Sequence, residues 1–166
     1  MGEAAPEEQT PGKTVSFSRT ELAELMLPHN ANILGKVFGG TILSLIDKAA
    51  ATAAIRHAGR TCVTAQMDRV TFREPIEIGE MVRFAAEVSY VGRTSLEVQV
   101  CVYALNVLTS EERLTNTCWV TFVAVGDDGR PAVVPPLLLE SDAERERFEA
   151  ARERVAERKR RRKLAR

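Results

Sequence analysis

Asn32, the pair Gly39-Gly40 and Asp47 have the types and spacing of a hydrolytic site. Asn32 lies in a loop, the two glycines lead into an apolar run, and Asp47 follows two helical turns later. Backbone N–H groups at a helix N-terminus can hold a carbonyl oxygen and stabilise the negative charge that develops on it. A nearby carboxylate can act as a general base on water or as a nucleophile, and an Asn amide can orient that water. The set therefore suits hydrolysis of an activated acyl group, with no metal required.

Asp47 stands out because a helical wheel places it inside an apolar arc with Leu43, Ala50 and Ala54. A carboxylate in such an arc is costly unless it is paired or hydrogen-bonded, which makes it a candidate functional group. A simpler interpretation is also open, in which Asp47 lies at the edge of the arc and pairs with a neighbouring cation.

Simpler interpretations are equally open for the other members of the set. Asn32 is of a residue type that commonly forms turns. Gly39 and Gly40 can satisfy a purely steric need for close packing at a helix start. Neither histidine is needed as a member of the candidate site, since His29 fits a surface loop and His57 suits a charge–dipole contact at the helix C-terminus.

The elements that position these residues follow from the pattern along the chain. A loop rich in Pro, Asn and Gly precedes a helix without Pro that runs from Thr41 and ends at Gly59, a fitting C-terminal cap. Val15–Ser18 suggests the start of a strand, whereas residues 22–26 fit either a strand or a helix. Period-two alternation with short links then predicts antiparallel strands: residues 61–73, 81–90, 96–104 and 114–125.

These elements predict an α+β fold, with one long helix, rich in small residues, against a single curved antiparallel sheet. Residues 1–13 are expected to be a disordered leader, 14–136 the folded domain, and 137–166 a charged tail that is helical from Ser141. A sheet of this kind leaves an edge strand exposed, and edge-to-edge pairing is the simplest remedy. We therefore expect a dimer at least.

Composition excludes several classes of protein. The 166 residues carry 23 basic and 23 acidic side chains, whereas a dedicated nucleic-acid binder usually has a clear basic excess. No run approaches the ~20 apolar residues that span a bilayer, so membrane insertion is not expected. Three cysteines outside any metal-binding spacing indicate free thiols and a cytoplasmic protein. The basic run 158–163 fits a solvated helix end, or alternatively a contact with nucleic acid or anionic membrane.

The segment from Asn32 to Asp47 resembles the signature of the acyl-CoA hydrolase family of hotdog-fold thioesterases. Members read N-x-x-G-x-(hydrophobic)-(aromatic or His)-G-G, followed by a helix that bears Asp or Glu at the matching place. The similarity extends over roughly residues 15–155. It implies the hotdog fold, in which a curved antiparallel sheet wraps one long central helix, and it implies paired protomers that bind acyl-CoA at their interface. Many relatives are trimers of dimers.

The resemblance also implies roles for individual residues. Asp47 would be the general base or nucleophile, Asn32 of the partner would position water or substrate, and the N–H of Gly39 or Gly40 would polarise the thioester carbonyl. Arg93, Thr94 and Ser95 match the turn that contacts CoA, where a cation and backbone N–H groups suit phosphates. The implied activity is acyl-CoA thioester hydrolysis on medium- or long-chain substrates, without serine esterase chemistry. No cofactor is implied, since CoA is part of the substrate and product.

One departure from the family pattern concerns the loop before the helix. Phe38 stands where several relatives have His, so no imidazole base is available at that position and Asp47 is the expected base. A non-catalytic binder of acyl-CoA or fatty acid on the same fold is the alternative, because a fold does not fix a function. A dehydratase of acyl thioesters is disfavoured, since the His expected of that branch is absent from the loop and helix.

Overall fold

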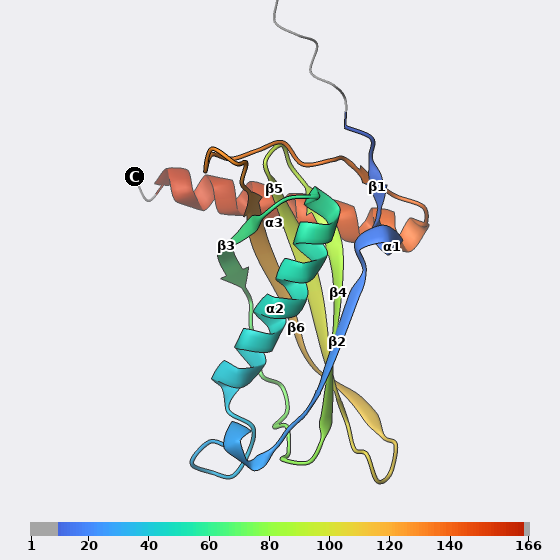
Figure 1. Cartoon of the computed structure of the whole chain (residues 1–166), viewed down its shortest axis with the longest axis vertical. Coiled ribbons are helices and arrows are strands. Elements are labelled where there is room, and N and C mark those ends of the chain that lie inside the picture. Colours follow the sequence, from blue (N-terminus) through green and yellow to red (C-terminus); the bar gives the residue numbers. More distant parts are fainter. Residues whose placement is uncertain (1–9, 165–166) are drawn as a thin grey trace, which may run out of the picture.

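The computed structural model describes residues 10–164 and contains a five-stranded antiparallel sheet in the order β2-β4-β5-β6-β3. The sheet curves around one long helix, which lies against one of its faces (Figure 1). The fold expected from the sequence is confirmed. The strands are β2 (Thr20–Leu25), β3 (Cys62–Asp68), β4 (Met81–Val91), β5 (Ser95–Leu105) and β6 (Glu112–Ala124).

The long helix is α2 (Gly39–Ala58), and its small residues let the sheet approach closely. Four alanines on the packed side are fully buried, at positions 49, 50, 53 and 54. They meet the inward-facing side chains of β4 and β5, which alternate with half-buried ones as the sequence predicts. The helix ends where expected, because Gly59 adopts a left-handed φ of 68° and donates its N–H to the carbonyl of Ile55 at 2.8 Å.

The N-terminal segment differs in part from the expectation. Val15–Ser18 is a single helical turn, α1, and not a strand; Thr14 caps it by accepting a hydrogen bond from the N–H of Phe17 at 3.2 Å. Of residues 22–26, which the sequence left undecided, 22–25 belong to β2 and Met26 follows its end. Lys13–Thr14 forms β1 and pairs in parallel with β7 (Leu137–Leu138), so no structural break lies at residue 13. Residues 1–9 of the expected leader lie outside the described residues.

Two elements near the sheet edge also differ. The strand expected over residues 61–73 ends at Asp68, because Arg69 takes a left-handed φ of 53° and residues 69–75 are irregular. A short 3-10 helix, η1 (Pro28–Asn30), lies within the loop that precedes α2. The shortened β3 is an outer strand of the sheet, so one of its edges has no paired strand.

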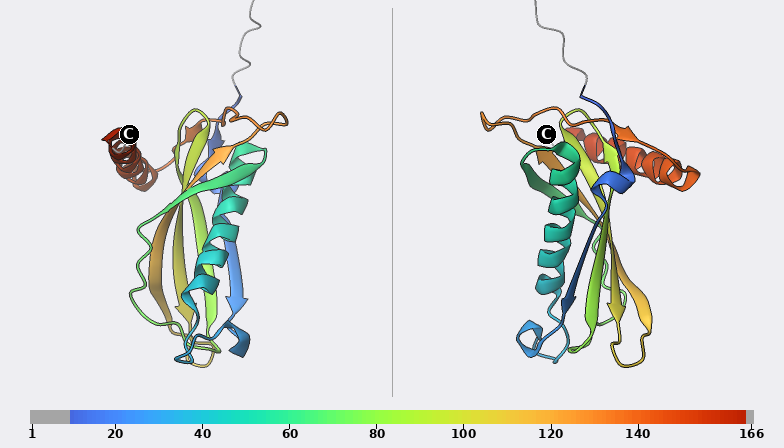
Figure 2. Two further views of the ribbon diagram at one scale, coloured as in Figure 1. Left: turned by 90° about the vertical axis from the view of Figure 1, so that its left-hand side faces the viewer. Right: turned by 45° about the vertical axis from the view of Figure 1, so that its right-hand side comes forward.

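The C-terminal helix α3 (Asp142–Leu164) crosses the sheet face opposite α2, as the two views of Figure 2 show. Ser141 accepts a hydrogen bond from the N–H of Glu144 at 3.2 Å, in keeping with its predicted capping role. Within the basic run 158–163, residues 159–163 are exposed, as expected for a solvated helix end, whereas Arg158 is largely covered. Arg154 and Arg158 have side chains only 18% and 16% exposed, and both bind the buried carboxylate of Glu97.

Across residues 10–164, every helix is too short or too polar to cross a lipid bilayer.

Candidate active site

The start of α2 presents two free backbone donors. Within residues 10–164, the N–H groups of Gly39 and Gly40 form no hydrogen bond, whereas the next N–H, of Thr41, donates to the carbonyl of Phe38 at 3.0 Å. The partial positive charge of the helix N-terminus adds to their attraction for an oxyanion. Two N–H groups without an acceptor are what an oxyanion site needs, and the role of Gly39 and Gly40 as oxyanion donors stays a prediction.

Both glycines also meet the steric need that the sequence analysis left open. A Cβ at Gly40 would lie 2.4 Å from a ring carbon of Phe38, and one at Gly39 would lie 3.3 Å from the ring of Phe72. The rings of Phe38 and Phe72 therefore occupy the space that a side chain at Gly40 or Gly39 would need. The steric interpretation of the Gly pair therefore applies, and it is compatible with the predicted functional one.

Asn32 lies in the loop before α2 and holds that loop in shape. Its side-chain oxygen accepts hydrogen bonds from the N–H groups of Leu34 at 2.9 Å and Lys36 at 3.2 Å. It is therefore a turn-former, which was the simpler of the two interpretations. Its amide NH2 has no partner within residues 10–164, and Asn32 and Gly39 both line a pocket of about 360 Å3. Turn formation by the oxygen leaves the amide hydrogens available to a ligand.

Asp47 is half-buried and accepts a hydrogen bond from the hydroxyl of Thr64 on β3, with 2.8 Å between Thr64 Oγ1 and Asp47 Oδ1. Within the described residues it has no ion pair, so the surface pairing with Lys48 or Arg56 is not observed. Arg56 instead binds the carbonyls of Phe17 and Arg19. The second carboxylate oxygen of Asp47 makes no bond within residues 10–164 and remains available to a water molecule.

Thr64 was missed by the sequence analysis because threonine is an ordinary strand residue. The period-two pattern groups it with Cys62 and Gln66, but the register of β3 shifts between Thr64 and Gln66, and only the crossing of α2 over the sheet brings Thr64 to Asp47. A signal was present in its position on the strand that directly follows α2. Such a strand must pass the helix again at a short distance.

The candidate residues occupy three separate places within one protomer. Asn32 and Gly39 lie at the start of α2, and Asp47 lies about 12 Å further along the helix at 1.5 Å per residue. The turn Arg93–Ser95, between β4 and β5, lies near the opposite end of α2 (Figure 1). The single chain therefore does not assemble the whole predicted set, and the gap is one that a second protomer can close.

His57 has a different role from the charged helix cap that the sequence suggested. Its side chain is fully buried, and Nε2 lies 3.0 Å from the carbonyl oxygen of Pro135. Burial lowers the pKa of His57, and the field of Lys13 lowers it further, whereas the bond to Pro135 acts in the opposite direction. The imidazole is thus a neutral structural donor that ties α2 to the segment before α3.

Burial also raises the pKa of Cys62 and of Cys118 to about 11. Both are free thiols held in the protonated form, which makes them poor nucleophiles and poor metal ligands. Among residues 10–164, no three His, Cys, Asp or Glu side chains are grouped so as to hold a metal ion.

Comparison with known proteins identifies a family. The family model of the Thioesterase superfamily matches residues 34–111. The uncharacterized acyl-CoA thioester hydrolase YkhA of Bacillus subtilis is 37% identical over 138 residues, which cover 83% of this chain and 80% of that protein. The acyl-CoA hydrolase from Staphylococcus aureus, solved with butyryl coenzyme A, coenzyme A and coenzyme A disulfide, superposes with a TM-score of 0.86 at 37% identity, over 93% of this chain and 94% of that one.

A hexameric acyl-CoA thioesterase without ligand superposes with a TM-score of 0.87 at 38% identity, over 92% of this chain and 97% of that one. The Staphylococcus aureus enzyme has also been solved with one Asn, one Asp and one Thr each replaced by Ala. The three replaced positions are separated by the same numbers of residues as Asn32, Asp47 and Thr64 are in this chain.

Proposed function

The chain belongs to the acyl-CoA hydrolase family of hotdog-fold thioesterases, and from that premise we propose that it hydrolyses medium- or long-chain fatty acyl-CoA to a free fatty acid and CoA. The observation that carries the proposal is the Asp47 carboxylate, held by Thr64 at 2.8 Å and not neutralised by any cation of the described residues. A thioester is already activated, so a base and oxyanion donors are sufficient for its hydrolysis.

The proposed reaction begins with water bound to the free oxygen of Asp47. The water oxygen adds to the thioester carbonyl carbon as its proton passes to the carboxylate. The N–H of Gly39 or Gly40 stabilises the resulting oxyanion. The tetrahedral intermediate then collapses, the C–S bond breaks, and the CoA thiolate takes the proton back from Asp47. In an alternative route the carboxylate attacks directly, and water hydrolyses the resulting anhydride.

Thr64 has a positioning role in this scheme, because its hydroxyl fixes the carboxylate and leaves one oxygen unoccupied. We place Asn32 of the partner subunit beside the same site, where its free amide hydrogens orient the water or the substrate. The equal spacing of the three substituted positions in the Staphylococcus aureus enzyme supports this grouping.

We further propose that protomers pair through β3 and assemble as a homo-oligomer, a dimer at least and a trimer of dimers in the complete form. The free edge of β3 supports the pairing, since exposed edges favour association. Large apolar side chains around the start of α2 are exposed as well: Ile33, Leu34, Phe38 and Phe72. Their position suits contact with a second protomer or with an acyl chain. The buried free thiols fit a reducing, cytoplasmic location.

A panel of saturated acyl-CoAs of increasing chain length tests the function. Release of the CoA thiol, followed with a thiol reagent, should be fastest for the medium and long chains. An Asp127→Ala variant, which alters an exposed loop acid, should match the wild type. Binding of acyl-CoA without thiol release at any chain length would instead support the non-catalytic binder.

Sharing of the site between protomers has its own test. Asp47→Ala and Asn32→Ala should each be almost inactive, whereas co-expression of the two variants should recover about a quarter of wild-type activity. The reason is that half of the randomly formed dimers contain both variants, and each of these has one intact site of two. Activity no higher than the sum of the two separate variants would contradict a shared site.

A further inference from the structure

Asn116 is the polar member of the buried row of side chains on β6. Cys118, Val120 and Phe122 continue that row, and like Asn116 they are fully buried. The side-chain oxygen of Asn116 is buried too and has no hydrogen-bond partner within residues 10–164. Because a buried, unpaired amide oxygen is costly, packing alone would favour an apolar residue at this position. The presence of Asn116 is better explained by the bond that its amide nitrogen makes.

The amide nitrogen of Asn116 donates a hydrogen bond to the carbonyl of Thr71, with 2.7 Å between the two atoms. Thr71 lies in the middle of the irregular segment 69–75, which follows β3. The N–H of Arg73 also donates to the carbonyl of Thr115 on β6, but over 3.4 Å, which is long for such a bond. Asn116 therefore provides the firmer of these two attachments between the middle of the segment and the sheet.

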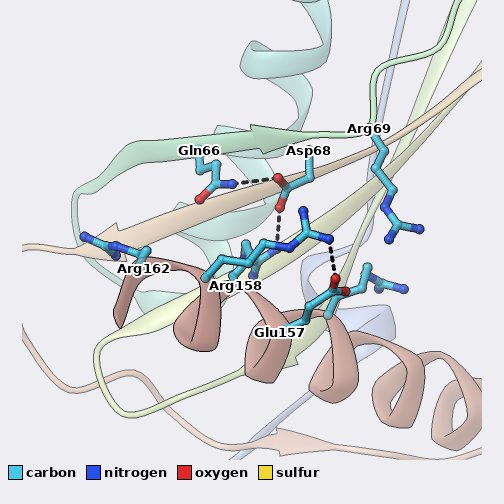
Figure 3. A pocket seen from close by; sticks show the side chains of 8 residues that line it. Gln66, Asp68, Arg69, Glu157, Arg158 and Arg162 are labelled. Carbon is cyan, nitrogen blue, oxygen red and sulfur yellow. Dashed lines mark hydrogen bonds and ion pairs between the residues drawn. The ribbon is translucent and has the colours of Figure 1, made fainter. Parts of the chain in front are cut away.

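The two ends of this segment have anchors of their own. Figure 3 shows Arg158 of α3 directed at Asp68, the last residue of β3, and their ion pair measures 2.5 Å. At the other end, Arg113 donates a hydrogen bond to the carbonyl of Pro75 at 2.9 Å. Loss of the Asn116 amide should therefore loosen the middle of the segment and leave both ends in place.

Phe72 directly follows Thr71 and lies against the start of α2. Its ring is 3.3 Å from the place that a Cβ at Gly39 would occupy, and both residues line the pocket that also contains Asn32. The N–H of Gly39 is one of the two proposed oxyanion donors. An apolar ring beside such a donor keeps water away from it, and a hydrogen bond to an oxyanion is stronger where water is excluded.

We propose that Asn116 is a positioning residue for the hydrolysis, because its bond to Thr71 holds the ring of Phe72 over the N–H of Gly39. The inference rests on the proposed function, since the donors act only in the hydrolytic step. Asn116 is fully buried on β6, so it acts through Phe72 and not by contact with the substrate. The two side chains then form one functional unit.

The kinetic test is a double-variant cycle. The steady-state constants for one acyl-CoA are measured for Asn116→Ala, Phe72→Ala and the double variant Asn116→Ala/Phe72→Ala. Thr115→Val is the matched control, because Thr115 is also fully buried on β6 but its hydroxyl donates to the carbonyl of Val102 within the sheet, at 3.1 Å. Valine keeps the shape of Thr115 and leaves the bond of its own carbonyl unchanged.

A second measurement does not depend on turnover. Hydrogen–deuterium exchange over residues 69–75 is compared among the wild type, Asn116→Ala and Thr115→Val, all without substrate. Exchange in this segment should rise in Asn116→Ala, because the middle of the segment opens more often, and should stay at the wild-type level in Thr115→Val.

We expect Asn116→Ala and Phe72→Ala each to lower kcat about tenfold with little change in KM, since oxyanion donors that compete with water stabilise the transition state less. The double variant should be no slower than Phe72→Ala alone, because Asn116 has no effect once the ring is absent. Thr115→Val should keep the kcat of the wild type.

Three results would overturn the proposal. The first is a double variant slower than Phe72→Ala by the full effect of Asn116→Ala, which would show that Asn116 acts independently of the ring. The second is an unchanged kcat in Phe72→Ala, a variant of a half-exposed residue that tests the shielding even where Asn116→Ala does not fold. The third is unchanged exchange over residues 69–75 in Asn116→Ala. An absence of hydrolysis by the wild type would refute the proposed function separately, since the exchange measurement needs no turnover.

Discussion

Glu97 offers the sharpest prediction about the stability of the fold. Its side chain is 1% exposed and accepts hydrogen bonds from Ser89 at 3.0 Å, Arg154 at 2.7 Å and Arg158 at 3.0 Å. Glu97→Ala removes the common acceptor of all three donors. The substitution therefore detaches α3 from the sheet at its main polar anchor and leaves two partly buried cations.

The magnitude follows from what each donor retains. Arg158 keeps Asp68 at 2.5 Å, whereas Arg154 keeps only its stacking on Trp119, with 4.6 Å between the guanidinium carbon and the ring centroid. Removing one partner of a buried ion pair costs about 3–5 kcal/mol. Partial access of water to both arginines places this case near the lower limit, at about 3 kcal/mol. That is a large share of the ~5–15 kcal/mol that stabilises a typical domain.

Urea unfolding at a fixed protomer concentration measures the effect, because oligomer stability depends on concentration. Glu112→Ala is the matched control, since Glu112 also binds an arginine, Arg83 at 2.7 Å, but is 37% exposed. Its removal should cost no more than about 1 kcal/mol. A loss for Glu97→Ala as small as that for Glu112→Ala would refute the reasoning on burial.

Three further predictions concern single residues. Because burial lowers the pKa of His57, the unfolded chain takes up a proton below about pH 6.5 that the folded chain does not, so the free energy of unfolding should fall on acidification. The variant His57→Gln should lessen that fall between about pH 7.5 and 5.5. Identical pH profiles for the variant and the wild type would contradict the assignment. Gly59→Ala should lower the free energy of unfolding by about 1 kcal/mol, because φ is 68° there, and an unchanged urea midpoint would contradict this. Thr64→Val should lower kcat about tenfold with little change in KM, and an unchanged kcat would remove Thr64 from the site.

The sequence predicts the elements well where a local signal marks their limits. Gly59 ends α2 because only a residue tolerant of positive φ fits there, and the alternation in β4 reports directly which face is buried. Arg69 bends the chain out of β3 although its residue type gives no warning, and Val15–Ser18 forms a turn that its β-prone residues do not suggest. Local pattern cannot report these tertiary effects.

The candidate site likewise contains features that the sequence predicts and features that depend on tertiary packing. The positions of Gly39, Gly40 and Asp47 on one helix follow from spacing alone. The bond from Thr64 to Asp47 depends on how α2 crosses the sheet, and the burial of Glu97 depends on where α3 lies, so neither could be deduced from period-two alternation. Alternation indeed places Glu97 on the outward polar face, and it becomes buried only because α3 covers that face.

Thiol release from a long-chain acyl-CoA by the wild type and by Asp47→Asn, at equal protein concentration, tests the central claim most directly. Asn keeps the shape and the hydrogen bond from Thr64 but cannot take a proton from water. The account predicts turnover by the wild type and a loss of at least about a hundredfold in kcat for Asp47→Asn, with CoA binding retained. Turnover by Asp47→Asn within a few-fold of the wild type would contradict the account.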